Sequence, residues 1–257
     1  MTDLFSLAGR TALVTGGSRG IGRMIAAGFI AQGARVYISN RKAAVAEQTA
    51  EELSAGGGFC RAIPADLATP QGIAALAGGF ASVESKLDIL VNNAGAAWLA
   101  PFDEFPEKGW DKVVDLNLKT PFFLTQALIG QLRAAASAGQ PAKVINIASI
   151  DGTAVNPQET YSYAASKAGL VHLTKRMSLR LIEDNIVVSA IAPGAFQSDM
   201  NLDARDHPDE VAKRIPSRRI GADEDMAGAA IFLASRAGDY VVGHTITVDG
   251  GVSLVRV

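Results

Sequence analysis

Residues Thr11–Gly22 read TALVTGGSRGIG and place three local signals in one short stretch. Thr11–Thr15 is a largely apolar run with β-branched residues, which is typical of a buried parallel strand. A loop with Gly16, Gly20 and Gly22 follows, and the residues after it have the composition of a helix. A strand, a glycine-rich loop and a helix in this order are the context in which a dinucleotide binds.

The glycine spacing in this loop is G-x-x-x-G-x-G and differs from the common G-x-G-x-x-G. Glycines let the backbone turn tightly and approach a pyrophosphate, which binds at the positive N-terminal end of the helix. An ordinary tight turn between strand and helix is the alternative, although three glycines exceed what such a turn needs. The residues expected to bind a dinucleotide here are Gly16, Ser18, Arg19, Gly20, Ile21 and Gly22.

The rest of the chain continues the alternation of strand and helix. Apolar runs predict strands near 11–15, 35–39, 59–63, 87–91, 143–148, 186–191 and 245–248. Helices are predicted near 20–32, 41–55, 70–84, 103–134, 161–184 and 223–234. Such alternation is typical of a parallel sheet with helices on both faces. We therefore expect an α/β fold, a single doubly wound (Rossmann) domain over residues 1–257 with a seven-stranded parallel sheet.

The composition is that of a globular protein, with 48% apolar and 19% charged residues among 257. A net charge of −2 gives no general attraction to nucleic acid or anionic membrane, and no apolar run is long enough to span a bilayer. The N-terminus lacks the basic flank and apolar core of a signal peptide. The single cysteine, Cys60, cannot form an internal disulfide, so we expect a cytoplasmic protein. The three histidines are scattered, so we expect no metal site.

Tyr163 and Lys167 lie four residues apart in a predicted helix, which places both on one helix face. Reduction of a carbonyl requires a proton on its oxygen, but a phenol is a poor acid because its ordinary pKa is about 10. A neighbouring ammonium favours the phenolate and so lowers that pKa. Ser149, upstream in the chain, can hydrogen-bond the substrate oxygen. Together the three residues predict a site for carbonyl reduction.

Tyr161 is an alternative acid two residues earlier. The residue four positions after it is Ala165, so no cation on that helix face lowers its pKa. We therefore expect Tyr161 to line the pocket or to pack, and Tyr163 to be the acid.

The end of the second predicted strand indicates which dinucleotide binds. An NAD enzyme places a carboxylate there, about 20 residues beyond the glycine loop, to bind the ribose diol. This chain has Asn40 followed by Arg41, so no carboxylate at this place repels a 2′-phosphate. The guanidiniums of Arg19 and Arg41 can bind that phosphate with charge-assisted hydrogen bonds. We expect NADP(H), with an Arg41 that merely faces water as the alternative.

These motifs together resemble the short-chain dehydrogenase/reductase family, and the resemblance covers essentially the whole chain. Asn92–Gly95 is similar to the family's N-N-A-G segment, and Val248–Gly251 is similar to its last strand and turn. Within the family the chain most resembles bacterial 3-oxoacyl reductases, including the rhamnolipid-biosynthesis type. It departs from the reductases of fatty-acid synthesis at Glu183–Asp184, where those proteins carry a basic residue that helps to dock the acyl carrier.

The resemblance implies roles for the matched positions. Asn117 would hold a water near Lys167, which would also bind the nicotinamide ribose, and Ser198 would contact the nicotinamide carboxamide. The expected catalytic residues are Asn117, Ser149, Tyr163 and Lys167. The further expected cofactor contacts are Asp66, Leu67, Asn93, Ala94, Gly95, Pro193, Gly194 and Ser198, besides Tyr163 and Lys167.

Apolar residues near the predicted site suit an acyl chain or another apolar ketone. We expect Trp98, Phe196 and Met200 to bind the substrate together with Ser149 and Tyr163, although such residues often only cover a core. The charged segment at about 195–216 resembles the family's substrate lid, with a plain surface loop as the alternative.

The expected activity is therefore the reduction of a ketone to a secondary alcohol by direct hydride transfer from NADPH. A dehydrogenase of polyols, sugars or cyclic alcohols is one alternative, and a non-catalytic nucleotide-binding regulator is another. The complete set of candidate catalytic residues counts against the regulator. By analogy with the family, helices near 103–134 and 161–184 pair between copies to give a homodimer or homotetramer.

Overall fold

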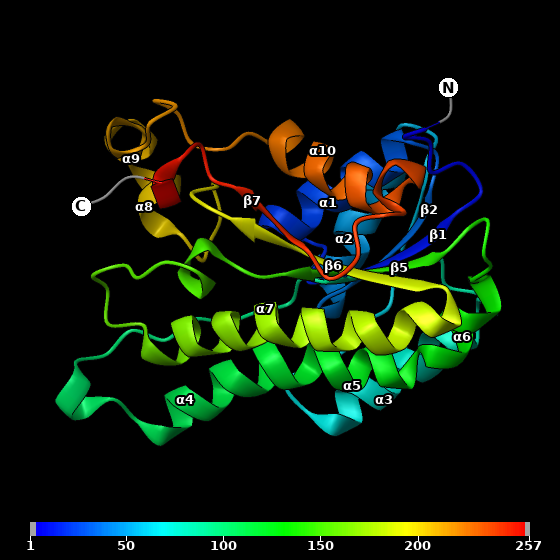
Figure 1. The fold of residues 1–257 in the computed structure, drawn as a ribbon, viewed down its shortest axis with the longest axis horizontal. Coiled ribbons are helices and arrows are strands. Elements are labelled where there is room, and N and C mark those ends of the chain that lie inside the picture. Colours follow the sequence, from blue (N-terminus) through cyan, green and yellow to red (C-terminus); the bar gives the residue numbers. More distant parts are fainter. Residues whose placement is uncertain (1–3, 255–257) are drawn as a thin grey trace.

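The computed structural model describes residues 4–254, and within them all seven strands are parallel and form one sheet (Figure 1). The strands are Thr11–Thr15 (β1), Arg35–Ser39 (β2), Phe59–Ala62 (β3), Ile89–Asn92 (β4), Ala142–Ile147 (β5), Ile186–Pro193 (β6) and Thr245–Val248 (β7). Their order across the sheet is β3-β2-β1-β4-β5-β6-β7. The chain therefore winds outward in both directions from β1 and β4, and the crevice at such a switch point is where open α/β sheets bind ligands.

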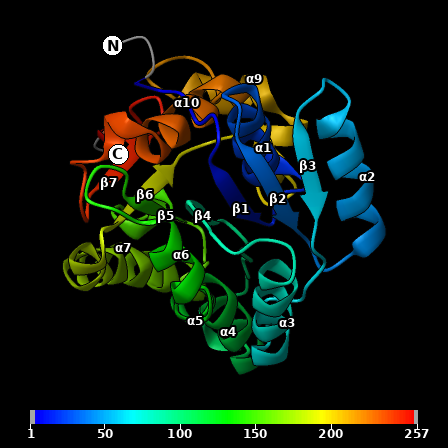
Figure 2. The same ribbon diagram turned by 90° about the vertical axis from the view of Figure 1, so that its right-hand side faces the viewer.

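Helices cover both faces of the sheet (Figure 2). On one face lie Gly20–Ala31 (α1), Ala43–Ser54 (α2) and Asp223–Ala234 (α10). On the other lie Pro70–Ala81 (α3), Glu107–Val114 (α4), Thr120–Ala127 (α5), Ile129–Ala135 (α6) and Tyr161–Leu181 (α7). Two short helices, Leu202–Asp206 (α8) and Pro208–Arg214 (α9), lie beyond the end of β6. The predicted fold class is confirmed.

Alternating side chains bury both faces of the central strands. Val14 of β1 packs in the cluster beneath α1 and α10, whereas its neighbour Leu13 packs in the cluster beneath α3, α5 and α7. Phe29 of α1 and Phe80 of α3 are fully buried in these two clusters. The central strands are therefore packed on both faces, and the loops at their carboxyl ends start from fixed positions.

The helix predicted over 103–134 is wrong as a single element. It is divided into a 3₁₀ turn (Phe102–Glu104), α4, a π turn (Asp115–Lys119), α5 and α6. Within the π turn the Thr120 amide donates to the Asp115 carbonyl, five residues back. Pro121 has no amide hydrogen to continue the normal ladder, which favours such a local widening.

Two other segments also differ from expectation. Segment 195–216 contains α8 and α9 and is therefore not a plain loop. The fourth strand begins and ends later than predicted, at Ile89–Asn92 rather than 87–91. No helix among residues 4–254 is sufficiently long and apolar to cross a membrane.

Candidate active site

The segments that carry the predicted catalytic and cofactor-binding residues meet at the carboxyl ends of the strands. The glycine loop follows β1, Asn93 follows β4, Ser149 follows β5 and Gly194 follows β6. The segment with α8 and α9 lies toward the same end of the molecule, at the left of Figure 1. Because all strands are parallel, segments far apart in the sequence meet at one edge.

Thr15 and Asn93 hold the glycine loop against the segment after β4. The Thr15 hydroxyl accepts from the Asn93 amide at 2.9 Å and from the Ala94 amide at 3.0 Å. The Asn93 side-chain amide donates to the Thr15 carbonyl at 2.8 Å. Thr15 was not among the predicted site residues, although a polar residue that ends an apolar strand before a glycine loop is a signal for such a role.

Two glycines of the loop are required by its geometry. Gly16 has φ of +63°, a conformation that residues with a Cβ rarely adopt. A Cβ on Gly22 would clash with the Gly16 carbonyl and would lie 2.5 Å from the Asn93 side-chain nitrogen. The first turn of α1 is therefore pressed against the loop.

This helix start fits the pyrophosphate of a dinucleotide. The N-cap residue of α1, Arg19, provides no side-chain cap, and the first turn contains no acidic residue. The first amides of a helix have no partner within the helix, and their partial positive charge favours an anion. The glycine backbone, with no Cβ in the way, lets that anion approach closely.

The ribose side of the site carries no carboxylate at the end of β2. Asn40 lies there instead, and its side-chain amide donates to the Ser18 hydroxyl while its oxygen accepts from the Lys42 amide at 3.0 Å. Arg41 is exposed, and the Arg19 guanidinium contacts Asp199 in the segment after β6. Of the two predicted guanidiniums, Arg41 is therefore exposed, whereas Arg19 pairs with a carboxylate of another segment.

Tyr163 lies in the first turn of α7 beside Ser149, which follows β5. Burial of the Tyr163 hydroxyl raises its pKa to about 12, although the hydrogen bond with Ser149 lowers it. The Asp151 carboxylate also raises the Tyr163 pKa, and the Asp151 amide donates to the Ser149 hydroxyl at 3.1 Å. Tyr163 is therefore protonated at neutral pH and can donate a proton.

Lys167 lies one helix turn after Tyr163 and is buried. Its ammonium nitrogen is 5.6 Å from the centroid of the Tyr163 ring and donates to the Ile147 carbonyl at 2.7 Å. Burial lowers the pKa of Lys167 to about 8. The expected decrease of the Tyr163 pKa below its ordinary value does not occur in this structure, because desolvation dominates both groups.

Asn117 lies in the π turn and connects the segment after β4 to α7. Its side chain accepts from the Ala96 amide at 2.8 Å and donates to the Ala96 carbonyl at 2.9 Å and to the Ser166 hydroxyl at 3.1 Å. Ser166 in turn donates to the Tyr163 carbonyl at 2.8 Å. Asn117 thereby fixes the start of α7 relative to the nucleotide side. Ser166, between Tyr163 and Lys167 in sequence, was missed because serine in a helix carries no specific signal.

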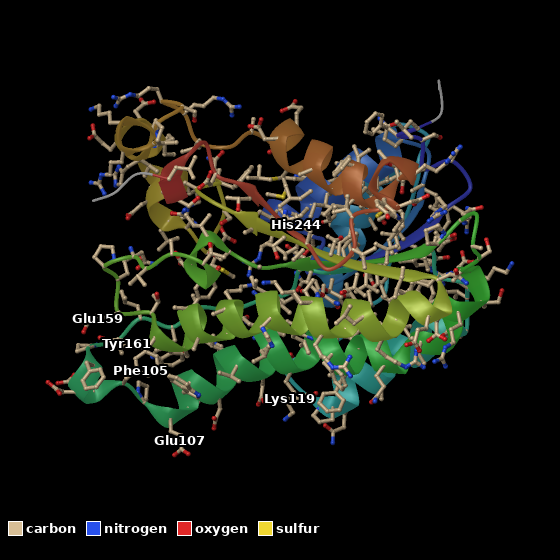
Figure 3. The ribbon with its side chains drawn as sticks, viewed as in Figure 1. Phe105, Glu107, Lys119, Glu159, Tyr161 and His244 are labelled. Atoms are coloured by element: carbon tan, nitrogen blue, oxygen red, sulfur yellow. The ribbon has the colours of Figure 1, made fainter. Side chains whose placement is uncertain are left out.

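Tyr161 was expected either to line the pocket or to pack. It packs at the outer end of α7. Its hydroxyl donates to Glu159 at 3.0 Å, and its ring centroid lies 5.6 Å from those of Phe102 and Phe105. Figure 3 shows Tyr161, Phe105 and Glu159 together at this end of the molecule.

The structure does not bring the three predicted apolar substrate residues into one pocket. Phe196 is buried in the core and its ring packs on Gly221, so its expected position in the substrate pocket is corrected. Trp98 packs against α4, with the Lys112 nitrogen 5.3 Å from its ring centroid. Met200 is about half exposed, at 49%.

The remaining predicted cofactor residues border the same edge. Asp66 is exposed, whereas Leu67 is buried and its carbonyl accepts from the Thr120 hydroxyl at 2.6 Å. The Gly194 amide, directly after Pro193 at the end of β6, donates to Val248 at 2.9 Å. The Ser198 hydroxyl accepts from the Asn201 amide at 3.2 Å. Among residues 4–254, no group of three or more His, Cys, Asp or Glu side chains is arranged to hold a metal ion.

Comparison with known proteins agrees with this arrangement. A family model described as enoyl-(acyl carrier protein) reductase matches residues 16–253. The rhamnolipids biosynthesis 3-oxoacyl-[acyl-carrier-protein] reductase of Pseudomonas aeruginosa is 46% identical, over 99% of this chain and 100% of its own length. The chain belongs to the short-chain dehydrogenase/reductase family. It is an oxidoreductase of that family, as the motifs predicted.

Further relatives are named for other substrates or were solved with NADP. The 5-keto-D-gluconate 5-reductase of Escherichia coli is 37% identical, over 98% of each chain. The solved Pseudomonas aeruginosa RhlG/NADP active-site complex has 45% identity and a TM-score of 0.94, and the match covers 98% of this chain and 100% of that one. A gluconate 5-dehydrogenase from Burkholderia cenocepacia, in complex with NADP and tartrate, has 34% identity and a TM-score of 0.89 over 99% of each chain.

Proposed function

We propose that this oxidoreductase reduces a ketone to a secondary alcohol with NADPH, and that the ketone is a 3-oxoacyl compound or another apolar carbonyl. The observation that carries this proposal is the grouping of Ser149, Tyr163 and Lys167 at the strand edge that also holds the glycine loop. A proton donor, a hydrogen-bond donor and a buried cation beside a nucleotide site are the groups that carbonyl reduction needs.

The cofactor is NADP(H). The tight glycine loop and the uncapped start of α1 suit its pyrophosphate, and Arg19 and Arg41 suit its 2′-phosphate. Asn40 supplies no carboxylate that would repel this phosphate. Solved relatives that carry NADP support the assignment, with 45% and 39% identity and TM-scores of 0.94 and 0.87.

When bound, the cofactor supplies the hydride. The residues of the chain supply the proton and stabilise the charges that form. The Tyr163 hydroxyl gives its proton to the carbonyl oxygen as negative charge develops there. The Ser149 hydroxyl donates a hydrogen bond to the same oxygen and so stabilises that charge. Lys167 lies one helix turn after Tyr163, and its ammonium group donates to the Ile147 carbonyl. Its charge stabilises the phenolate that Tyr163 becomes. Asn117 keeps α7 in register with the nucleotide side.

Two observations support an apolar substrate. The relative with 46% identity is named a 3-oxoacyl-[acyl-carrier-protein] reductase. Large exposed apolar side chains lie in the loop after β4 and in the segment after β6, where a substrate would approach the strand edge: Leu99, Phe102, Met200 and Leu202. The second candidate is a sugar acid or polyol, because relatives with 37% and 38% identity are named for keto-gluconate and deoxy-gluconate substrates.

A substrate panel distinguishes these candidates. NADPH oxidation is measured with 3-oxoacyl thioesters of increasing chain length and with 5-keto-gluconate and neutral sugar ketones. We expect kcat/KM to be at least about tenfold higher for the thioesters and to rise with chain length, since each buried methylene contributes about 0.8 kcal/mol. A preference for 5-keto-gluconate would instead establish the sugar-acid activity. If the protein binds NADPH but reduces none of these ketones, the result would support a non-catalytic nucleotide-binding regulator.

We also propose that the protein is cytoplasmic, with no membrane or nucleic-acid partner, and forms a homodimer or homotetramer. Apolar side chains on the outer surfaces of α4, α5 and α7 support the assembly, since a monomer exposes few such patches. They are Trp110, Phe122, Phe123 and Leu179. Light scattering coupled to size-exclusion chromatography measures the mass, and a monomer at micromolar concentration would contradict this assembly.

A further inference from the structure

A carboxylate in the segment after β6 contacts the guanidinium that the proposed function assigns to the 2′-phosphate. Arg19 in the glycine loop lies 2.5 Å from an oxygen of Asp199, from Nη1 to Oδ2. The two residues are 180 positions apart in the sequence. This ion pair therefore joins the nucleotide loop directly to the segment that leads into α8.

Asp199 has a second cationic partner. Nη1 of Arg205 in α8 lies 3.1 Å from Asp199 Oδ1, and Arg205 also pairs with its neighbour Asp206 at 2.7 Å. Hydrogen bonds from Arg205 and Arg19 lower the pKa of Asp199, so this carboxylate is ionised at neutral pH. Asp199 therefore keeps a cation when Arg19 changes partner.

The ion pair lies in a hollow beside the start of α1. Arg19, Asp199 and Arg205 line a cavity of about 470 Å³, together with residues of α1. The side chains of Arg19 and Asp199 are 67% and 49% exposed. Arg23, which lines the same cavity, pairs with Glu52 at 2.9 Å.

We propose that Asp199 is a specificity-determining residue that competes with the 2′-phosphate of NADP(H) for Arg19. The inference rests on the proposed role of Arg19 in binding that phosphate. A phosphate carries about two negative charges and three acceptor oxygens, so Arg19 leaves the single carboxylate for it. NADH has no 2′-phosphate and leaves the Arg19–Asp199 pair intact. Asp199 thus weakens NADPH binding, and its release from Arg19 frees the segment before α8 only when NADPH binds.

The test is a double-mutant cycle read by equilibrium binding. Dissociation constants for NADPH and NADH are measured by nicotinamide fluorescence on the wild type, Asp199→Asn, Arg19→Gln and the double variant. We expect Asp199→Asn to tighten NADPH binding about two- to fivefold, the range that an exposed ion pair spans, and to leave NADH unchanged. In the Arg19→Gln background, Asp199→Asn should no longer affect NADPH binding.

The control is Asp206→Asn, which removes a partner of Arg205 but not of Arg19 and should leave both dissociation constants unchanged. Unchanged NADPH affinity in Asp199→Asn would overturn the inference. Equal tightening of NADPH and NADH would also overturn it, since it would indicate general repulsion of the cofactor. Failure of the proposed function is distinguishable, because Arg19→Gln itself would then leave NADPH affinity unaltered. Melting temperatures establish that all variants are folded.

Discussion

Burial shifts the pKa values of Tyr163 and Lys167 in opposite directions, and both shifts favour the uncharged form. The Tyr163 pKa rises to about 12 and the Lys167 pKa falls to about 8. At neutral pH both side chains therefore carry their protons, as the proposed donation from Tyr163 to a carbonyl oxygen requires. In the proposed mechanism the Lys167 cation matters most after the donation, when Tyr163 would otherwise be a buried, unpaired anion.

The activity should depend on pH through Lys167. We expect kcat/KM for ketone reduction to fall as pH rises through about 8, because the lysine then loses the charge that stabilises the Tyr163 phenolate. Tyr163, with a pKa of about 12, keeps its proton over that range and does not cause the decrease. A pH–rate profile from about pH 6 to pH 10 checks this. A profile that stays flat to the alkaline limit would show that the charge of Lys167 does not contribute.

Residue spacing was sufficient to predict the grouping of Tyr163 and Lys167, since four residues are one helix turn. Residue spacing was not sufficient to predict the contact of Asp199 with Arg19 or the burial of Phe196. The contact of Asp199 with Arg19 depends on how the strand ends are brought together, which no local pattern encodes. Phe196 is buried because its ring packs on Gly221, and an aromatic residue in a loop has the same sequence signal whether it covers a core or lines a pocket.

The start of α1 depends on a glycine, and this dependence has a matched control in α3. A Cβ at Gly22 would meet the Gly16 carbonyl, whereas a Cβ at Gly78 would meet nothing within 4 Å. We expect Gly22→Ala to weaken NADPH binding at least about tenfold and to lower the melting temperature, because helix and loop must separate. Gly78→Ala should keep NADPH affinity and stabilise the protein by about 0.5–1 kcal/mol. Calorimetric binding and thermal unfolding measure both effects, and equal behaviour of the variants would contradict the proposed packing.

Strands were predicted more closely than the long helical region. β2 and β7 have their predicted bounds because buried apolar runs between turns identify strands. The region 103–134 has helical composition throughout, yet the structure divides it at the π turn beside Pro121. Such a turn costs helical hydrogen bonds, and these are compensated by tertiary contacts such as those of Asn117 with Ala96 and Ser166. Composition alone carries no information about these contacts.

At the scale of the whole molecule, the candidate active site and a group of buried charges lie at opposite edges of the sheet. At the edge opposite the site, the fully buried Lys143 at the start of β5 pairs with Asp239 at 2.7 Å. Nearby, Arg10 pairs with Asp88 at 3.3 Å, and the Lys143 amide donates to the Asp88 carbonyl at 2.8 Å. These contacts connect β1, β4 and β5 with the segment after α10. They are remote from the carboxyl ends of the strands.

Removal of one charge from this edge should therefore reduce stability without reducing activity. We expect Asp239→Ala to lower the free energy of unfolding by roughly 3 kcal/mol, because a buried lysine loses its partner. Glu51→Ala, on the exposed side of α2, is the control and should change stability by less than about 0.5 kcal/mol. Denaturant unfolding and kcat/KM below the melting range are the measurements. A large loss of activity in folded Asp239→Ala would show that the two edges are coupled.

The most direct test of the proposed mechanism is the Tyr163→Phe variant, which removes one hydroxyl and keeps the ring. The measurement is NADPH-dependent reduction of the best ketone of the substrate panel, together with the NADPH dissociation constant of the same preparation. The mechanism predicts that kcat falls by about 100-fold or more while NADPH affinity stays within about twofold, since only the proton donor is lost. Turnover at the wild-type rate in this variant would contradict the assignment of Tyr163 as the acid.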